Sequence, residues 1–444
     1  MKDTLLIKNG IIATLGENNR VLYGHSLLCE GGKIKKIAKD AEFKGKYDKV
    51  LDASGKVVMP GIINAHMHFY STMVRGLGKA KPSKDFREIL ENLWWRLDKK
   101  LSLDDCYYSA LLPLVDAVKR GTTTLIDHHA SPFAARGSLN RIAEAVKLSG
   151  LRASLCYELS DRDGQKISDE GQAENAEFIK RCAKEKDPQL RAMYGLHASF
   201  TINDKTMEKA AKSGRELGAG FHVHTAEAQS DQDYNVQHFG LRVVERLNKF
   251  GILGPKTIAA HCVHINEREM ELLAQTKTAV VHNPQSNMNN AVGIADIVKL
   301  NAKGVLVGLG TDAMTVNMLE EVRVALWAQH LKHNNPSVGF MEALSALLFN
   351  NAQIAGRQWE GMGLGVLAEG NAADIILIDY YPPTPLNEDT FLGHLGFGLS
   401  QSFVDSTIAG GKVLMENKKL KLDLDEKEIA AKSMELSEKL WQRF

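Results

Sequence analysis

Short apolar runs alternate with polar, helix-like stretches through the middle of the chain. Eight runs read as buried strands, at residues 61–68, 122–129, 152–158, 190–197, 218–225, 257–262, 278–283 and 304–312. A helix such as NRIAEAVKLSG lies between two of them, with Ile142, Ala145 and Val146 on one face and Gly150 at its end. Eight strand–helix units over about 250 residues predict an α/β fold of the (β/α)8 TIM-barrel type. An open doubly wound sheet is the alternative, but no G-x-G-x-x-G follows an early strand.

The two ends of the chain have a different texture. Their apolar runs are broken by Asn-Gly, Gly-Gly and Ser-Gly pairs, which is typical of antiparallel hairpins. Each end alone is too small for a good core. We therefore expect residues 1–57 and 360–444 to form one small β-sandwich, including a closing helix in EKEIAAKSMELSEKLWQRF, beside a barrel of residues 58–359.

Composition excludes several classes of protein. The formal net charge of +1 over 444 residues gives no indication of a nucleic-acid partner. No stretch of about 18 apolar residues predicts a membrane span, and MKDTLLIKNGII lacks the apolar core of a signal peptide. The five cysteines are scattered and form no CxxC pair, so neither a disulfide framework nor a zinc–cysteine site is expected. A reducing cytoplasm fits best.

Histidines cluster where predicted strands end. The carboxyl ends of barrel strands open onto one face, which holds the active site. His66-x-His68 is the sharpest motif, because residues two apart on a strand point the same way and imidazole binds zinc or iron. His222-x-His224 repeats the spacing, and either histidine could supply a third nitrogen. Other strand-end histidines are His128, His129, His197, His261 and His282.

Two carboxylates belong to the same pattern. Asp312 ends the apolar run GVLVGLGTD, where an acid is costly unless it is paired or binds metal, although a helix N-cap is an alternative. Glu227 could reach a substrate atom beside the metal, or be a solvated loop residue. His261 could polarise a substrate oxygen or leaving group and His197 could hold substrate, with a structural role as the alternative for both. Because no G-x-S-x-G elbow and no phosphate-binding loop occur, activated water is the favoured nucleophile.

Several segments resemble the strand motifs of the amidohydrolase superfamily over nearly the whole chain. They are VMPGIINAHMH, RGTTTLID, HVHTAE, AAHCVH, HNPQSNM, GTDA and GVLAEGNAADIILID. Within the superfamily the chain resembles the branch of guanine deaminase, adenosylhomocysteine deaminase and triazine hydrolase. The segments DYYPPTPLNEDTF and GHLGFGLSQSFVDSTIAGGKVLM are most similar to the SsnA-type aminohydrolases.

The resemblance implies a ligand set and a division of roles. It implies one divalent metal ion, with zinc, iron and manganese all compatible, held by His66, His68, His224 and Asp312. Two-metal members use a carbamylated lysine on the fourth strand, and RAMYGLHASF has none. The resemblance also implies that Glu227 protonates a ring nitrogen and that His261 orients the attacked group. Asp312 would accept the proton of water, His197 would contact substrate, and His222 would support the site from outside.

We therefore expect a metal-dependent aminohydrolase acting on an amino-substituted heterocycle such as a purine, pterin or triazine. Hydrolysis of a cyclic amide, or of another C–N or C–Cl bond, is one alternative. A non-catalytic metal-binding scaffold is the other, although an acid and a base beside the metal argue against it. The loops NNAVGIADI and MTVNM depart from the branch, so the substrate cannot be copied from a relative. Relatives often form dimers, which makes a homodimer compatible with the resemblance.

Overall fold

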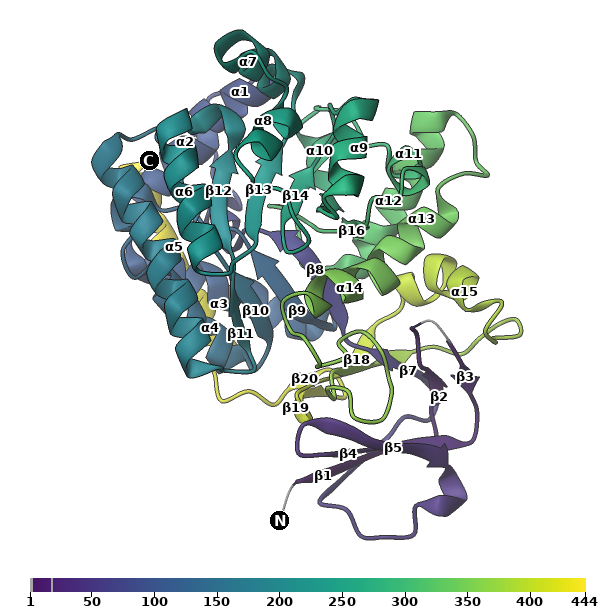
Figure 1. Ribbon diagram of the computed structural model, residues 1–444. Helices are drawn as coiled ribbons and strands as arrows, with labels where there is room; N and C mark the ends of the chain where they lie inside the picture. The colour runs from purple at the N-terminus through teal and green to yellow at the C-terminus, as the bar shows by residue number, and fades with distance from the viewer. Residues whose placement is uncertain (1–2, 17–18) are drawn as a thin grey trace.

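Parallel strands form the centre of the molecule. The computed structural model describes residues 3–16 and 19–444, so residues 1–2 and 17–18 of the expected N-terminal unit lie outside the described residues (Figure 1). One parallel sheet has the order β11-β10-β9-β8 and the other the order β12-β13-β14-β15-β16. The strands are β8 (Ile62–Met67), β9 (Thr122–Asp127), β10 (Arg152–Leu155), β11 (Leu190–Ala192), β12 (Tyr194–Ala198), β13 (Phe221–Thr225), β14 (Ile258–His261), β15 (Ala279–His282) and β16 (Val307–Leu309).

Isolated parallel bridges join the two sheets at both edges. Met67 pairs with Asp312 beyond the end of β16, and Leu159 beyond β10 pairs with Leu196 of β12. The predicted strand 190–197 is interrupted at Met193, because β11 pairs with β10 whereas β12 pairs with β13. All these strands run parallel, so their carboxyl ends open on one side of the molecule.

Helices cover the outer faces of the parallel sheets (Figure 1). The helices of this layer are α3 (Leu103–Lys119), α4 (Ser138–Ser149), α5 (Gln165–Glu185), α6 (Asp204–Glu216), α7 (Gln229–Phe239), α8 (Val243–Lys249), α9 (Glu267–Gln275), α10 (Pro284–Asn289), α11 (Ile297–Ala302), α12 (Met318–His333), α13 (Phe340–Ser345) and α14 (Asn351–Gly356). The amphipathic segment predicted before Gly150 is α4, and Gly150 ends it with a φ of 75°. That left-handed conformation is the one glycine adopts without strain.

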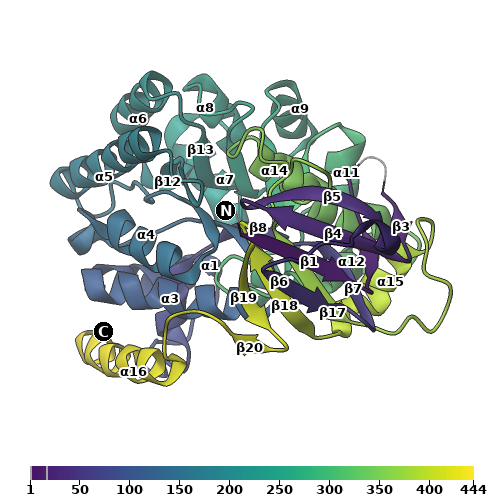
Figure 2. The same ribbon diagram turned by 90° about the horizontal axis from the view of Figure 1, so that it is seen from below.

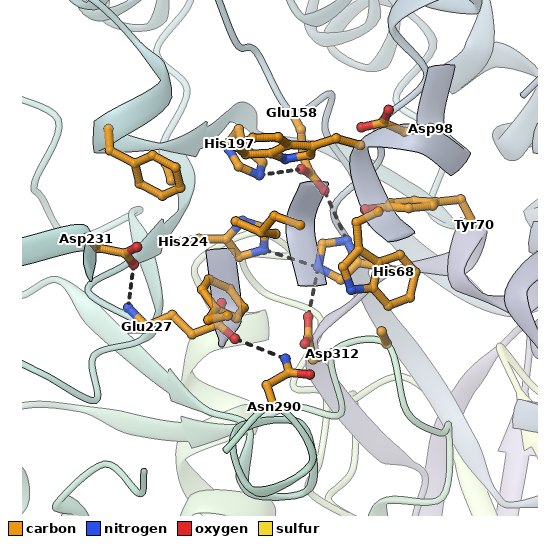
Figure 3. Close-up of a pocket in the computed structure, with 17 residues that line it drawn as sticks. His68, Tyr70, Asp98, Glu158, His197, His224, Glu227, Asp231, Asn290 and Asp312 are labelled. Atoms are coloured by element: carbon orange, nitrogen blue, oxygen red, sulfur yellow. Dashed lines mark hydrogen bonds and ion pairs between the residues drawn. The ribbon is translucent and has the colours of Figure 1, made fainter. Parts of the chain in front are cut away.

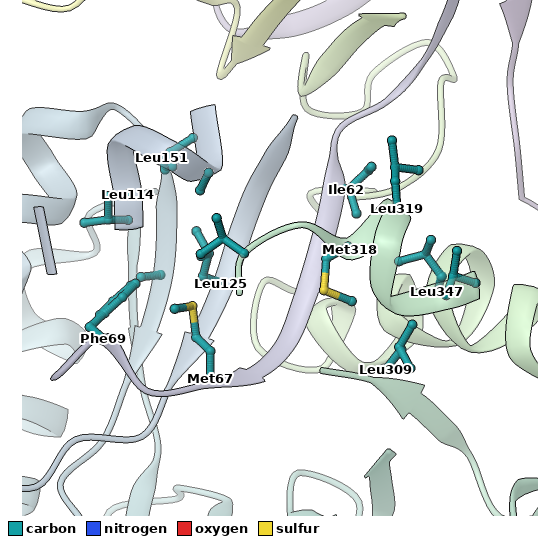
Figure 4. Close-up of a cluster of buried hydrophobic side chains, with 14 of the residues drawn as sticks. Ile62, Met67, Phe69, Leu114, Leu125, Leu151, Leu309, Met318, Leu319 and Leu347 are labelled. Atoms are coloured by element: carbon teal, nitrogen blue, oxygen red, sulfur yellow. The ribbon is translucent and has the colours of Figure 1, made fainter. Parts of the chain in front are cut away.

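A shared core holds helices against strands. In Figure 4, Met67 of β8 and Leu125 of β9 lie near Leu114 of α3, while Ile62 and Leu319 of α12 pack further along the same cluster. Each side chain is at most 4% exposed. Burying an aliphatic side chain of this size stabilises the fold by about 1.5–3 kcal/mol, before entropy is counted.

Strands from both ends of the chain pair with one another. One sheet has the order β5-β4-β1-β6 and a larger one the order β20-β19-β18-β17-β7-β2-β3. In the larger sheet β17 runs antiparallel to β7, with Ile375 opposite Pro60. These strands are β1 (Thr4–Lys8), β2 (Ile11–Ala13), β3 (Val21–Leu22), β4 (His25–Glu30), β5 (Lys33–Lys39), β6 (Lys49–Asp52), β7 (Lys56–Pro60), β17 (Ile375–Asp379), β18 (Val404–Ala409), β19 (Lys412–Glu416) and β20 (Lys419–Leu420).

The last helix lies away from these terminal sheets. The sequence grouped α16 (Glu426–Arg443) with the β-rich ends, but the helix packs beside α3 (Figure 2). Leu440 is fully buried, and the Trp441 indole donates to the Met73 carbonyl at 2.8 Å. In the described part of the chain, no helix is long and apolar enough to cross a membrane.

Candidate active site

The four expected metal ligands meet at the carboxyl ends of the parallel strands (Figure 3 labels three of them). His66 lies in β8 and His68 directly follows it, so both point to the same side of that strand. His224 lies in β13 and Asp312 follows β16. The main chain fixes this meeting, because the N–H groups of Thr311 and Asp312 both donate to the His66 carbonyl, at 2.9 and 3.1 Å.

Three separations among these donor atoms are close to those between the ligands of a tetrahedral metal site. Nε2 of His68 lies 2.8 Å from Oδ1 of Asp312 and 3.1 Å from Nε2 of His224, and Nε2 of His66 lies 3.2 Å from the same Oδ1. Two ligands bound tetrahedrally at about 2.0–2.1 Å are separated by about 3.3 Å. Oδ1 of Asp312 is therefore close to the imidazoles of both His66 and His68. Burial lowers the pKa of His224 well below 6.5, which favours the neutral ring that binds metal.

Other combinations of these groups also converge. His128 lies with His66, His68 and His224 in a second set whose ligand atoms all fall within 4.8 Å of one another. His66, His224, His261 and Asp312 form another such set. The four expected ligands are divided between these two sets and do not form a set of their own. The donor chemistry therefore fits a metal without assigning its ligands uniquely.

Asp312 adopts a strained conformation at the centre of the site. Its φ is 51°, in the left-handed region where Asp and Asn are the tolerated non-glycine residues. The alternative role as a helix N-cap is excluded, because Asn317 occupies that position before α12. Burial alone raises its pKa, yet His68 and His66 hold the Asp312 pKa well below 3.8. The Ser286 hydroxyl donates to its other oxygen, so Asp312 is a fixed, ionised carboxylate.

Glu227 is a buried acid rather than a solvated loop residue. Only 5% of it is exposed, just beyond β13. Burial raises the Glu227 pKa well above 4.5, and the charges of Asp312 and Asp231 raise it further. The Glu227 main-chain N–H donates to Asp231 at 2.9 Å, which helps to position the loop, and the Asn290 amide lies 3.4 Å from Oε1. This environment favours the protonated form of the Glu227 carboxyl group.

His261 presents a proton toward the site. The Asn287 amide donates to its Nδ1 at 2.9 Å, so the proton of the neutral ring lies on Nε2. Burial lowers the His261 pKa to about 3. Nε2 lies 3.4 Å from Oε2 of Glu227 and has no hydrogen-bond partner within the described ranges. A positive φ of 73° at the end of β14 is a second strained position at this edge.

His197 lines the cavity that also contains the expected ligands His68, His224 and Asp312. Its Nδ1 lies 2.9 Å from the Thr201 hydroxyl, and burial lowers its pKa well below 6.5. Around it are large apolar and aromatic side chains that the sequence analysis did not single out: Tyr70, Phe86, Leu90, Trp94, Trp95 and Phe200. Leu90 and Trp94 come from η3 (Leu90–Trp94), a π-helical turn between α1 (Phe86–Ile89) and α2 (Trp95–Leu97). Their i, i+4 spacing resembles an ordinary core stripe, which hides their place in the cavity.

Sequence reasoning missed several polar residues of the cavity, and Glu158 lies nearest to an expected metal ligand among them. It lines the cavity, is 3% exposed, and its Oε1 lies 3.1 Å from Nδ1 of His68. A signal was present, because Glu158 closes the predicted strand 152–158 as Asp312 closes 304–312.

The remaining strand-end histidines lie behind the ligands. His222 Nε2 lies 2.8 Å from Nδ1 of His66 and so fixes the orientation of that ring. His128 stacks on His222 with ring centroids 4.4 Å apart. His129 contacts the Ser131 hydroxyl at 2.9 Å, and His282 is buried with neither ring nitrogen bonded among the described residues. We see no physical reason for the burial of His282.

The geometry supports acid–base chemistry on a small molecule. Asp312, whose pKa is lowered, and Glu227, whose pKa is raised, lie on either side of a cluster of imidazoles. Such pairs of groups, with pKa values pushed apart by their surroundings, mark acid and base roles in active sites. A hydrogen-bond donor, Nε2 of His261, faces the same space.

Comparison with known proteins gives consistent findings. The amidohydrolase family model matches residues 57–414. A 5-methylthioadenosine/S-adenosylhomocysteine deaminase of Syntrophomonas wolfei is 32% identical over 98% of this chain and 99% of that protein. A 5'-deoxyadenosine deaminase of Methanobrevibacter smithii is 31% identical over 99% of this chain and 98% of that protein. The structure of an adenosine deaminase from Xanthomonas campestris with bound zinc has a TM-score of 0.86, with 22% identity and 98% coverage of both chains. This likeness shows a TIM-barrel-type fold and confirms the predicted fold at that level.

Proposed function

The chain belongs to the amidohydrolase family, and from that premise we propose that it releases ammonia from an amino-substituted heterocycle by metal-dependent hydrolysis. The observation that carries the proposal is the opposed pair of carboxyl groups, Asp312 with a lowered pKa and Glu227 with a raised one. Deamination of a ring needs both, since water must lose a proton and a ring nitrogen must gain one.

Each residue then has a stated task. His66, His68, His224 and Asp312 would hold one divalent ion, which we propose to be zinc, with iron or manganese as substitutes. The ion, when bound, supplies the Lewis acidity that makes water nucleophilic at neutral pH. Asp312 takes the proton of the attacking water, and Glu227 delivers a proton to the ring nitrogen. Nε2 of His261 donates to the attacked group and His197 contacts the ring.

The fold is proposed to divide the labour between two units. Residues 58–359 form a (β/α)8 barrel, and residues 1–57 with 360–444 form one β-rich sandwich from which α16 extends to pack beside α3. The antiparallel pairing of β17 with β7 supports this division. Proteolysis that releases two separately folded terminal fragments would contradict the division.

The five cysteines are free thiols, which supports a cytoplasmic location.

A panel of aminopurines, aminopterins and aminotriazines tests the activity. The metal-loaded protein should release ammonia from at least one compound while the ring absorbance shifts but persists. Ring opening without ammonia, or chloride release from a chlorotriazine, would favour the alternative hydrolases. No turnover of any compound by protein that holds one metal ion per chain would favour a scaffold.

A further inference from the structure

Glu158 stands out as a buried carboxylate that the proposed reaction does not use. It follows β10, and its main-chain N–H donates to the His129 carbonyl at 2.7 Å, which fixes the residue at the rim of the strand ends. Figure 3 shows Glu158 and His197 on one side of His68 and His224, with Glu227 on the other. A ring bound over His68 and His224 would therefore lie between the two glutamates.

Among the described residues, none is a hydrogen-bond donor to Oε1 of the Glu158 carboxylate. Its nearest neighbour, Nδ1 of His68, lies 2.5 Å from the His128 carbonyl, so the ring proton is directed to that oxygen. The guanidinium of Arg162 pairs through Nη2 with Asp98 at 2.8 Å, and its buried Nη1 has no hydrogen-bond partner among the described residues. Oε1 of Glu158 has no hydrogen-bond partner in the described part of the chain. A buried carboxylate in this state is costly unless a ligand supplies the donor.

His197 adds a second acceptor beside it. The Thr201 hydroxyl donates its only proton to the Ala198 carbonyl at 3.0 Å, so it accepts from Nδ1 of His197. Nε2 of the neutral His197 ring is then an acceptor, 3.8 Å from Oε2 of Glu158. Two acceptors side by side cannot satisfy each other, and both line the cavity. This wall is complementary to N–H groups of a ligand.

We propose that Glu158 is a substrate-binding, specificity-determining residue that accepts a hydrogen bond from a ring N–H. The inference rests on the proposed function and narrows its substrate class. Glu227 protonates one ring nitrogen next to the attacked carbon, and Glu158 receives the N–H on the other side. The preferred substrate is then a cyclic guanidine, in which the amino-bearing carbon lies between an imine-type nitrogen and an N–H, as in a 2-amino-4-oxopyrimidine ring. Adenine-type rings have carbon in place of that N–H.

Paired probes test the inference. Calorimetry with the metal-loaded protein compares 2-amino-4-oxopyrimidine with its 3-methyl derivative, which lacks the N–H, and ammonia release is measured for both. The parent protein should bind the N–H compound about 10- to 100-fold more tightly, the scale of a hydrogen bond to a charged group. Glu158→Gln should reduce this ratio to a few fold and Glu158→Ala should abolish it, with metal content retained.

Glu174→Gln is the matched control, because Glu174 is buried on α5 and accepts from the main-chain N–H of Gly137, outside the cavity. It should keep the parent ratio. Equal binding of the two probes by the parent protein would overturn the inference. So would a Glu158→Gln protein that loses metal and weakens both probes equally, since Glu158 would then only orient His68. Selective binding of the N–H compound without ammonia release would refute the proposed deaminase function but support the Glu158 subsite. Equal ammonia release from both probes would support the deaminase function and refute the subsite.

Discussion

The interior of the terminal sheets and the carboxyl-terminal edge of the parallel strands are both buried, but they are built from opposite materials. Leu27, Val58 and Ile375 belong to a cluster of buried apolar side chains between the terminal strands. At the strand edge, His66, His261 and other histidines are fully buried together with carboxylates. Burial stabilises the first region, whereas it costs free energy in the second unless a ligand compensates. The difference shows which region is arranged for stability and which for chemistry.

Removal of a ligand histidine should break the site most completely. His66→Ala or His68→Ala deletes one of the convergent nitrogens, so we expect most of the metal and all detectable turnover to be lost. His25→Ala in β4 is the control, because His25 lies in a terminal sheet, where its Nδ1 is 2.8 Å from the Tyr23 carbonyl oxygen. Elemental analysis should give about one ion per chain for the parent and the control. Full metal retention in both site variants would refute the ligand assignment, and two ions per chain would refute a mononuclear site.

Asp312→Asn should separate metal binding from proton transfer. Asn tolerates the left-handed conformation of Asp312 and keeps one oxygen ligand, but it cannot accept a proton. We expect kcat to fall by about 10³- to 10⁴-fold, toward the upper range for loss of a general base, while part of the metal remains. The measurement is steady-state kinetics beside metal analysis on one preparation. A kcat within tenfold of the parent would mean that another group accepts the proton.

A truncation in the terminal core should have the opposite signature. Leu27 is fully buried in β4, and Leu27→Ala should lower the free energy of unfolding by about 2–5 kcal/mol. The kcat of the folded enzyme should not change, because the terminal core is separate from the strand ends. Leu331→Ala, at a side chain that is 77% exposed, should change stability by no more than about 0.5 kcal/mol. Denaturant unfolding and steady-state kinetics on the same samples measure both effects. A large loss of kcat for Leu27→Ala would contradict the distinction between a stabilising core and a separate catalytic edge.

The buried acid Glu321 should make the free energy of unfolding depend on pH. Burial raises the pKa of Glu321 from 4.5 to about 8. The folded state therefore retains a proton that the unfolded chain loses, and its stability falls as pH rises from 4.5 to about 8. Glu321→Gln removes this penalty. We expect the stability of the variant relative to the parent to increase by roughly 2–4 kcal/mol between about pH 5 and pH 9. A pH-independent difference in unfolding free energy would show that Glu321 titrates normally.

Most of the strand ends could be predicted from sequence, because parallel strands buried on both faces leave apolar runs that stop at polar residues. The runs themselves are shorter in the structure. The predicted strand 304–312 contains only β16 (Val307–Leu309). The Gly310 N–H still donates to the His282 carbonyl of β15 at 2.9 Å, whereas the next N–H, of Thr311, donates to His66 of β8. A Cβ on Gly310 would lie 2.7 Å from the His66 carbonyl oxygen. That close approach is a tertiary contact, which no periodicity reveals.

Site residues could be predicted from the sequence where their spacing forms a motif. They could not be predicted where their role depends on residues that are distant in the sequence. His66-x-His68 carries its own geometry, because the spacing alone places two imidazoles together. Glu158 has no such spacing, and its importance comes from His197 and Thr201, which lie far along the chain. The placement of α16 was missed for the same reason, since its buried Leu440 indicates a packed face but not the partner surface.

The most direct test of the account is the substitution Glu227→Gln. The central claim is that Glu227 is a proton donor that does not bind the metal. The variant should keep the metal content of the parent, while kcat falls by about 100-fold or more, the usual scale for a general acid. Steady-state rates and elemental analysis on the same preparation give both numbers. A Glu227→Gln protein whose kcat stays within a few fold of the parent would contradict the mechanism, even with every metal ligand confirmed.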